Sequence, residues 1–273
     1  MQIKDFTEAH IENALQIAKI NCENERAFVP ELPDVDKTLD LTEFAKNGLG
    51  VAAFEGDEMV GFLCCVSPFK NVFRSTEATG VFSPMSANGA IGKNRASVFA
   101  RMYQAAGEKW AKAGASSHAV CLYAHDREAN EQFFRYGFGI RTVDAIRELH
   151  QIDAPNCEEY FFSLLAKEEK TKILPLQNLL NESYLNSPFF MYRENGNDVS
   201  YELCFVAEYE NKTVAFIKAE TDGENFIVNT PGYLHVNGAF CQPEHRGKGL
   251  HQKLLNLLSA EIKKRGYARL GVD

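Results

Sequence analysis

The sequence predicts an α+β (mixed α/β) fold made of two related halves. Two segments, 53–62 and 207–216, both run as strand, polar two-residue turn and strand, which is the pattern of a β-hairpin. A short apolar strand that ends at a proline follows each hairpin, at 80–84 and at 238–243. The halves match at an offset of about 152–158 residues, which favours a duplication over a chance likeness between two α/β segments.

A long amphipathic helix is predicted after each of these strands. Apolar residues recur at helical spacing in both halves, namely Phe99, Tyr103, Ala106 and Trp110 in the first and Leu250, Leu254, Leu257, Leu258 and Ile262 in the second. Gly114 and Gly266 stand where C-terminal helix caps are expected. A strand is predicted after each cap, at 118–123 and at 268–272.

Each half also opens with a predicted helix, at 8–26 and within 168–186. Between the halves, the segment 149–158 contains a proline and several polar residues and indicates a linker or turn. A strand is predicted directly after it, at 160–165.

The two predicted domains, 1–150 and 151–273, end differently. The first continues through 124–147 as a helix and a strand, and the second has no counterpart of these residues. Either the chain is cut short, or the second domain is naturally abbreviated, or another chain completes it. A sheet edge left open in this way would favour pairing with a second copy, so a homodimer is a hypothesis.

The composition is that of an ordinary globular chain, with 45% hydrophobic and 24% charged residues among 273. A net charge of −8 argues against broad binding to nucleic acid, which requires a basic surface. No apolar run approaches the length of a membrane span, and the N-terminus has no signal-peptide core. Seven scattered cysteines with no Cys-x-x-Cys pair predict reduced thiols, no metal site and a cytoplasmic location.

The most informative segment is Arg246-Gly-Lys-Gly249-Leu-His251, which lies between a predicted strand and a predicted helix. A glycine-spaced basic turn at a helix N-terminus directs several backbone N–H groups and cationic side chains at one point. Such a turn favours a diphosphate, and hence a phosphorylated cofactor.

The order of elements and this segment resemble the GNAT superfamily of acetyl-CoA-dependent N-acyltransferases, whose central motif is Arg/Gln-x-x-Gly-x-Gly/Ala. The resemblance implies two tandem domains, each with a mostly antiparallel central sheet flanked by helices. It also implies that the strand at 239–241 pairs with the pantetheine arm of acetyl-CoA and that the amides of 247–251 hold its pyrophosphate. The cofactor-binding residues expected from it are Ala239, Phe240, Cys241, Arg246, Gly247, Lys248, Gly249, Leu250 and His251. His251 departs from the motif, where a small residue is usual, and would narrow the cradle.

The later motif of the family is matched only in the first half, from Asp126 through Phe133 to Phe138. Phe133 stands where the family often has a tyrosine that protonates the departing thiolate. The segment 88–94 has some likeness to a phosphate-binding P-loop, but its glycine spacing is too short, and we expect a structural loop. The cofactor loop of the first domain is therefore degenerate.

The resemblance implies direct transfer of an acetyl group to a primary amine on a small molecule or a peptide. The base candidates are His235, on the cofactor strand, and His125, past a strand end; the alternatives are a satisfied strand histidine and a turn residue. Cys241 is expected to be a packed thiol, and Glu220 a surface residue. Two other functions stay open, a non-catalytic acyl-CoA-binding regulatory module and an interaction scaffold.

Overall fold

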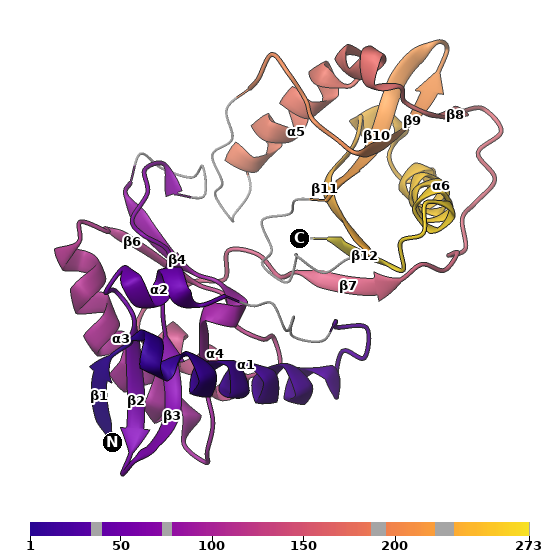
Figure 1. Cartoon of the computed structure of the whole chain (residues 1–273). Coiled ribbons are helices and arrows are strands. Elements are labelled where there is room, and N and C mark those ends of the chain that lie inside the picture. The colour runs from indigo at the N-terminus through magenta and orange to yellow at the C-terminus, as the bar shows by residue number, and fades with distance from the viewer. Residues whose placement is uncertain (34–39, 73–77, 187–194, 222–231, 273) are drawn as a thin grey trace. The chain divides into compact units, whose positions relative to one another are not determined.

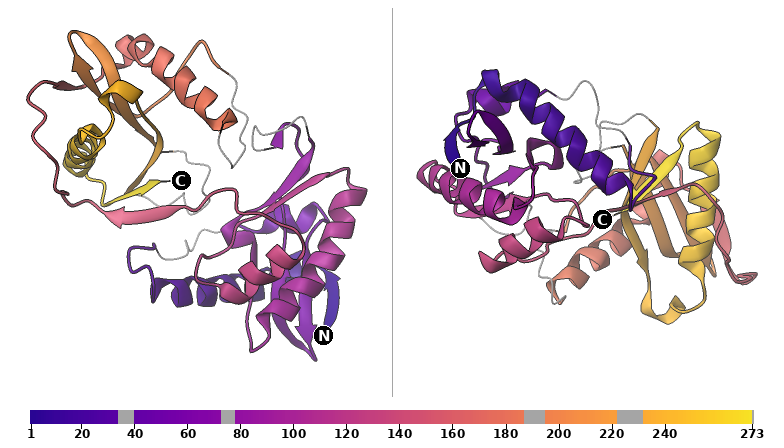
Figure 2. Two further views of the ribbon diagram at one scale, coloured as in Figure 1. Left: turned by 180° about the vertical axis from the view of Figure 1, so that it is seen from behind. Right: turned by 90° about the horizontal axis from the view of Figure 1, so that it is seen from below.

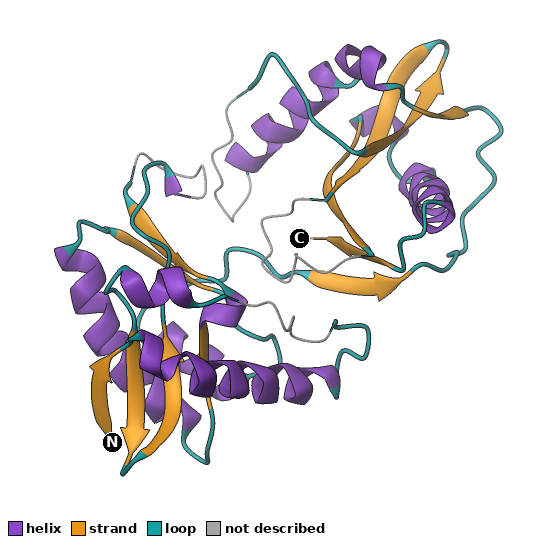
Figure 3. Cartoon of the chain, viewed as in Figure 1, coloured by secondary structure: helices purple, strands orange, loops and turns teal. Residues whose placement is uncertain are grey.

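The computed structural model describes residues 1–33, 40–72, 78–186, 195–221 and 232–272. The chain divides into two compact units, Met1–Arg141 and Thr142–Asp273. The predicted α+β class is confirmed, because each unit has a mostly antiparallel sheet with helices packed against it (Figures 1 and 3). None of the helices in the described residues is both long and apolar enough to span a membrane.

The first unit contains six strands and four α-helices among its described residues. In chain order they are β1 (Gln2–Asp5), α1 (Ile11–Arg26), α2 (Thr42–Lys46), β2 (Val51–Glu55), β3 (Glu58–Leu63), β4 (Gly80–Ser83), β5 (Asn88–Ala90), α3 (Arg95–Lys112), β6 (Ser117–Val120) and α4 (Arg127–Arg135). The strands β1-β2-β3-β5 form an antiparallel sheet, and β4 pairs in parallel with β6. Helix α1 packs on one face of the antiparallel sheet, and α3 and α4 pack on the other.

The second unit contains one six-stranded sheet. Its elements are β7 (Ala145–Glu148), β8 (Phe161–Leu164), α5 (Leu174–Leu185), β9 (Leu203–Tyr209), β10 (Lys212–Glu220), β11 (Tyr233–Cys241), α6 (Leu250–Lys264) and β12 (Arg269–Val272). The strand order is β7-β12-β11-β10-β9-β8, and only β11 and β12 run in parallel. Helices α6 and α5 cover opposite faces of this sheet (Figure 2).

Local signals in the sequence are confirmed at the turns. Glu210 and Asn211 have φ angles of 49° and 62°, which is the left-handed geometry of a tight hairpin turn between β9 and β10. Gly114 and Gly266 have φ angles of 90° and 86° directly after α3 and α6, as expected for C-terminal caps. The seven cysteines all lie in the described residues, and none of them forms a disulfide.

Strand β7 corrects one expectation about the second unit. This strand was predicted as the end of the first half, yet it pairs antiparallel with β12, from Ala145↔Val272 to Glu148↔Arg269. The edge of β12 that faces away from β11 is therefore occupied by the preceding segment of the same chain. The prediction of an open edge there is wrong, and with it the argument for a homodimer.

The strand pairing also corrects the alignment of the two halves. Ala90 pairs with Gly61 in the first unit, and Cys241 pairs with Ala215 at the matching position of the second hairpin. The counterpart of the strand end 239–241 is therefore β5. Strand β4 pairs in parallel with β6, just as 233–236 pairs in parallel with β12. The counterpart of β4 is therefore 233–236, and the predicted match of 80–84 with 238–243 is wrong.

Candidate functional site

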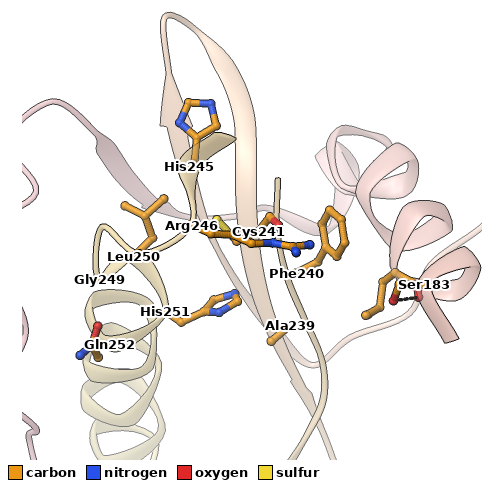
Figure 4. Close-up of a pocket in the computed structure, with 12 residues that line it drawn as sticks. Ser183, Ala239, Phe240, Cys241, His245, Arg246, Gly249, Leu250, His251 and Gln252 are labelled. Carbon is orange, nitrogen blue, oxygen red and sulfur yellow. Dashed lines mark hydrogen bonds between the residues drawn. The ribbon is translucent and has the colours of Figure 1, made fainter. Parts of the chain in front are cut away.

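A pocket of about 430 Å³ lies in the second unit, between the N-terminus of α6, the end of β11 and α5 (Figure 4). Its volume is within the range of about 300–1,000 Å³ that is typical of small-molecule sites. The residues that line it are Leu180, Ser183, Ala239, Phe240, Cys241, His245, Arg246, Gly247, Gly249, Leu250, His251 and Gln252. All the residues expected at the cofactor lie along this pocket except Lys248.

The loop before α6 has the backbone geometry of an anion cradle. Gly247 and Gly249 have φ angles of 76° and 80°, and Gly249 is the N-cap of α6. The first N–H groups of a helix have no partner within the helix and carry the positive end of its dipole. A Cβ at Gly247 would have no atom within 4 Å, so this glycine borders open space in the pocket.

The preceding linker holds this loop in place. A Cβ on Gly249 would stand 2.0 Å from Cγ of Pro155, so only glycine fits there. The thiol of Cys157 donates to the carbonyl of Lys248 at 3.4 Å. About two turns further along α6, Asn256 bonds to both the N–H and the C=O of Ile152.

The two basic residues of the motif differ in orientation. Arg246 donates from Nε to the carbonyl of Cys241 at 3.0 Å, and its guanidinium lies 5.8 Å from the ring centre of Phe240 on the pocket wall. The Nζ of Lys248 lies instead 5.5 Å from the ring centre of Tyr160, and a hydrogen bond to that hydroxyl raises the pKa of Lys248. Arg246 is thus the motif cation that borders the pocket.

His251 places an imidazole in the pocket, where the family motif has a small residue. Its ring points toward the same side as Arg246, whereas the ring of His245 points away (Figure 4). Loss of solvent around the ring lowers the pKa of His251, and the charge of Arg246 adds to this effect. A neutral ring therefore narrows the cradle at pH 7.

Strand β11 has a bulge next to the pocket. The pairing with β10 shifts at Asn237, since Lys218 pairs with Gly238 and Ala219 pairs with Val236. Strand β12 pairs with β11 only from Tyr233 to Val236. From the bulge to Cys241, no described strand pairs with this edge of β11, and its backbone groups can accept an added strand.

His235 lies on β11 before the bulge and is fully buried. Its Nδ1 is 3.1 Å from the hydroxyl of Tyr233, and it pairs across the sheet with Glu220. The Tyr233 hydroxyl stands 1.7 Å from where a Cβ on Gly271 would be, so glycine at 271 makes room for this ring. Cys241 is also buried, and burial raises the pKa of its thiol, as expected for a packed cysteine.

His125 belongs to the first unit, where it holds α1 to the turn before α4. Its Nδ1 lies 2.8 Å from the buried carboxylate of Glu25, and Phe28 stacks on its ring at 4.5 Å. Asp126 caps α4 by accepting from the N–H of Ala129. The expected turn role of this segment is confirmed.

In the first unit, side chains occupy the backbone groups of β5, the counterpart of the strand end 239–241. Asn21 on α1 donates to the carbonyl of Ala90 at 3.0 Å and accepts from its N–H at 3.2 Å. Asn88 donates to the carbonyls of Pro84 and Cys121 in the gap between β5 and β6. Asn94 caps α3, which agrees with the expected structural loop. Phe133 is buried, and its ring packs against the rings of Phe99 and Tyr103.

Sequence reasoning missed a polar group on the α5 side of the second sheet. Lys218 is only 7% exposed and donates to the carbonyl of Ser200 at 3.1 Å. Glu220, expected at the surface, accepts from the Ser200 hydroxyl and lies 3.6 Å from Lys218. Gln177 on α5 lies beside Gly238, as Lys218 does, and donates to Asn181. The signal in the sequence for this buried polar group was Lys218 itself, a charged residue between apolar residues of a predicted strand.

Residues 149–273 match the model of the acetyltransferase (GNAT) family. This part of the chain is a GNAT-family domain. The GNAT fold explains why the glycine turn, the helix N-terminus and the free edge of β11 meet at one pocket, and it supports acyl transfer as the general chemistry. No curated protein sequence matches the chain.

Two solved structures share the fold along the whole chain. A GCN5-related N-acetyltransferase from Sphaerobacter thermophilus is 14% identical, with a TM-score of 0.54 over 99% of this chain and 85% of that one. A GCN5-related glucosamine N-acetyltransferase region of a fungal multi-domain GH3 β-N-acetylglucosaminidase is 13% identical, with a TM-score of 0.51. That comparison covers 100% of this chain and only 35% of the fungal chain. At such identities the likeness shows the fold alone.

Proposed function

We propose that the second unit transfers an acetyl group from acetyl-CoA directly to a primary amine. The observation that carries this proposal is one pocket that joins the N-terminus of α6 to the edge of β11 with which no described strand pairs. These are the two features that a diphosphate and an extended amide chain need, namely free N–H donors and a strand edge.

The residues present fit acetyl-CoA, which supplies an acetyl group activated as a thioester. The open face of Gly247 and the amides of 247–251 would hold the diphosphate, and Arg246 would add positive charge from the pocket wall. Backbone groups of 239–241 would pair with the amides of the pantetheine arm. This places the reacting end of the cofactor at the bulge, next to Asn237 and Gly238.

The transfer requires one bond to form and one to break. The lone pair of the amine nitrogen forms the new C–N bond, the C–S bond breaks with its electron pair on sulfur, and the proton lost by nitrogen ends on that sulfur. A primary amine with a pKa near 10.4 is neutral about once in a thousand at pH 7, so a group that accepts its proton increases the rate.

We propose His235 as this base. It lies two residues before the bulge on the same strand. Replacement by glutamine should lower kcat by about 100-fold, the lower end of what general-base catalysis contributes, with acetyl-CoA affinity unchanged. An unchanged pH profile of kcat in His235→Gln would assign the histidine to packing only.

Glucosamine is the first acceptor to test, because the fungal region that shares this fold is a glucosamine N-acetyltransferase. The assay measures release of free thiol from acetyl-CoA with and without glucosamine. Thiol release that depends on the amine supports the transferase.

The matched pair Gly247→Asp and Gly247→Asn tests the cradle. Both residues tolerate positive φ, and both side chains have room in the pocket. Aspartate adds a negative charge where the diphosphate would lie, and we expect its acetyl-CoA affinity to fall at least about tenfold below that of the asparagine variant. Equal affinities would place the diphosphate elsewhere.

One observation favours a second candidate, a non-catalytic acyl-CoA-binding module: the full burial of His235. This function predicts acetyl-CoA binding without amine-dependent thiol release. We propose that the first unit is a second GNAT-like domain without a cofactor of its own.

A further inference from the structure

His251 is the second residue of α6 and lines the pocket of the second unit. The N–H of Lys253 donates to the carbonyl of Gly249 at 3.1 Å, and the N–H groups of 250–252 before it have no partner within the helix. Side chains of a helix tilt toward its N-terminus, which brings the imidazole over this same turn. The ring lies on the side toward which Arg246 points (Figure 4). The imidazole therefore stands beside the donors of the anion cradle.

The described lining of this pocket offers no negative partner to a protonated imidazole. It contains a guanidinium, two imidazoles and a thiol, but no carboxylate. The ring of His245 points away from the pocket (Figure 4), and its Nδ1 lies 3.0 Å from the hydroxyl of Tyr160. Burial raises the pKa of the Cys241 thiol, which is therefore uncharged at pH 7. The fixed charge beside His251 is thus the positive charge of Arg246, and a counter-charge has to come with a ligand.

The ring of His251 is neutral at pH 7 while the pocket is empty. Loss of solvent lowers its pKa, and Arg246 acts in the same direction; the carbonyls of Phe240 and Phe216 oppose this without outweighing it. The two residues that line the pocket from α5 do not titrate. A neutral imidazole has one N–H and one lone pair, and that lone pair repels an anion. An imidazolium has an N–H on both nitrogens and attracts one.

We propose that His251 binds the diphosphate of acetyl-CoA as an imidazolium, so that cofactor binding takes up a proton from solution. This inference rests on the proposed function. The diphosphate supplies the missing negative charge, and an opposite charge within about 4–6 Å favours the charged form of a histidine. The proton comes from the buffer and adds to the ring nitrogen that had the lone pair. Affinity for acetyl-CoA should therefore rise as the pH falls, until the ring is protonated in the free protein as well.

The variant His251→Ala separates a ring that binds the cofactor from a ring that only narrows the cradle. Alanine restores a small residue at the helix start and removes the imidazole. If the imidazolium binds the diphosphate, loss of this charge-assisted hydrogen bond should weaken acetyl-CoA binding about tenfold at pH 6. Tighter binding by His251→Ala at that pH would show that the ring is an obstacle, and would overturn the inference.

Calorimetric titration of the full chain at pH 7, in two buffers with different heats of ionisation, counts the protons taken up with acetyl-CoA. The 3′-phosphate of the cofactor has a pKa of about 6 and also contributes, so the wild type is compared with His251→Gln on the same ligand. We expect the wild type to take up at least about 0.3 proton more per acetyl-CoA. His245→Gln, whose ring is turned out of the pocket, is the matched control and should take up as many protons as the wild type.

The outcomes distinguish this inference from the function on which it rests. Equal proton uptake by the wild type and His251→Gln overturns the inference and leaves the proposed function in place. Equal reductions in His251→Gln and His245→Gln would also overturn it, because the uptake would then not belong to the ring in the pocket. No binding of acetyl-CoA by the wild type overturns the proposed function as well.

Discussion

His118 shows how burial of one side chain ties stability to pH. The ring lies in the first unit with its Nδ1 2.9 Å from the hydroxyl of Tyr103, and it meets Trp110 edge-on at 5.1 Å. Burial lowers the pKa of His118 below its ordinary value. The unfolded chain therefore binds a proton more readily than the folded protein does, and stability falls as the pH drops through the unfolded value of about 6.5.

The replacement His118→Gln should reduce this loss. We expect the drop in melting temperature between about pH 7.5 and 5.5 to be smaller than in the wild type by roughly 1–2 °C. His150→Gln, at an exposed position, is the control and should behave as the wild type does. An undiminished drop in His118→Gln would show that other groups carry the pH dependence.

The sequence predicted the roles of some single residues and not of others. The glycines of the cradle follow from a local rule, because positive φ next to a helix start favours glycine. Lys248 was expected at the pocket, but its orientation depends on Tyr160, which lies far away in sequence. The hydrogen bond from Lys218 to the carbonyl of Ser200 was not predictable, since it depends on tertiary packing.

Strand β7 was predicted as the end of the first half, but it belongs to the sheet of the second unit. Its four residues pair with β12 over the whole length of both strands and so cover the sheet edge that would otherwise be exposed. The helical and strand periodicity predicted that a strand exists near this position. The partner of a strand is set by tertiary packing, and periodicity contains no information about it.

We expect Ile146→Pro to destabilise the second unit, because proline removes a donor and cannot adopt the strand conformation without strain. The loss should be about 1–3 kcal/mol in denaturant unfolding, with added self-association through the exposed edge of β12. Val143→Pro, at a 62% exposed position before the strand, is the matched control. Equal stability of the two variants would mean that β7 does not hold the sheet together.

At the scale of the whole molecule, the two units share the order strand, helix, hairpin, strand, helix, strand and differ at the strand edge that corresponds to 237–241. In the second unit, no strand among the described residues pairs with the edge of β11 from 237 to 241 beside the pocket. In the first unit the corresponding backbone at Ala90 is already bonded to Asn21, and Asn88 fills the neighbouring gap. A pantetheine arm would have to displace these bonds, so the first unit should not bind acetyl-CoA.

The most direct test is a calorimetric titration of the full chain with acetyl-CoA. We predict one site per chain with a dissociation constant in the micromolar range, equivalent to about −8 kcal/mol, and its loss in Gly247→Asp but not in Asn21→Asp. Two sites per chain would show that the first unit also binds the cofactor. No binding would show that the pocket at α6 is not an acetyl-CoA site, which would contradict the proposed transferase.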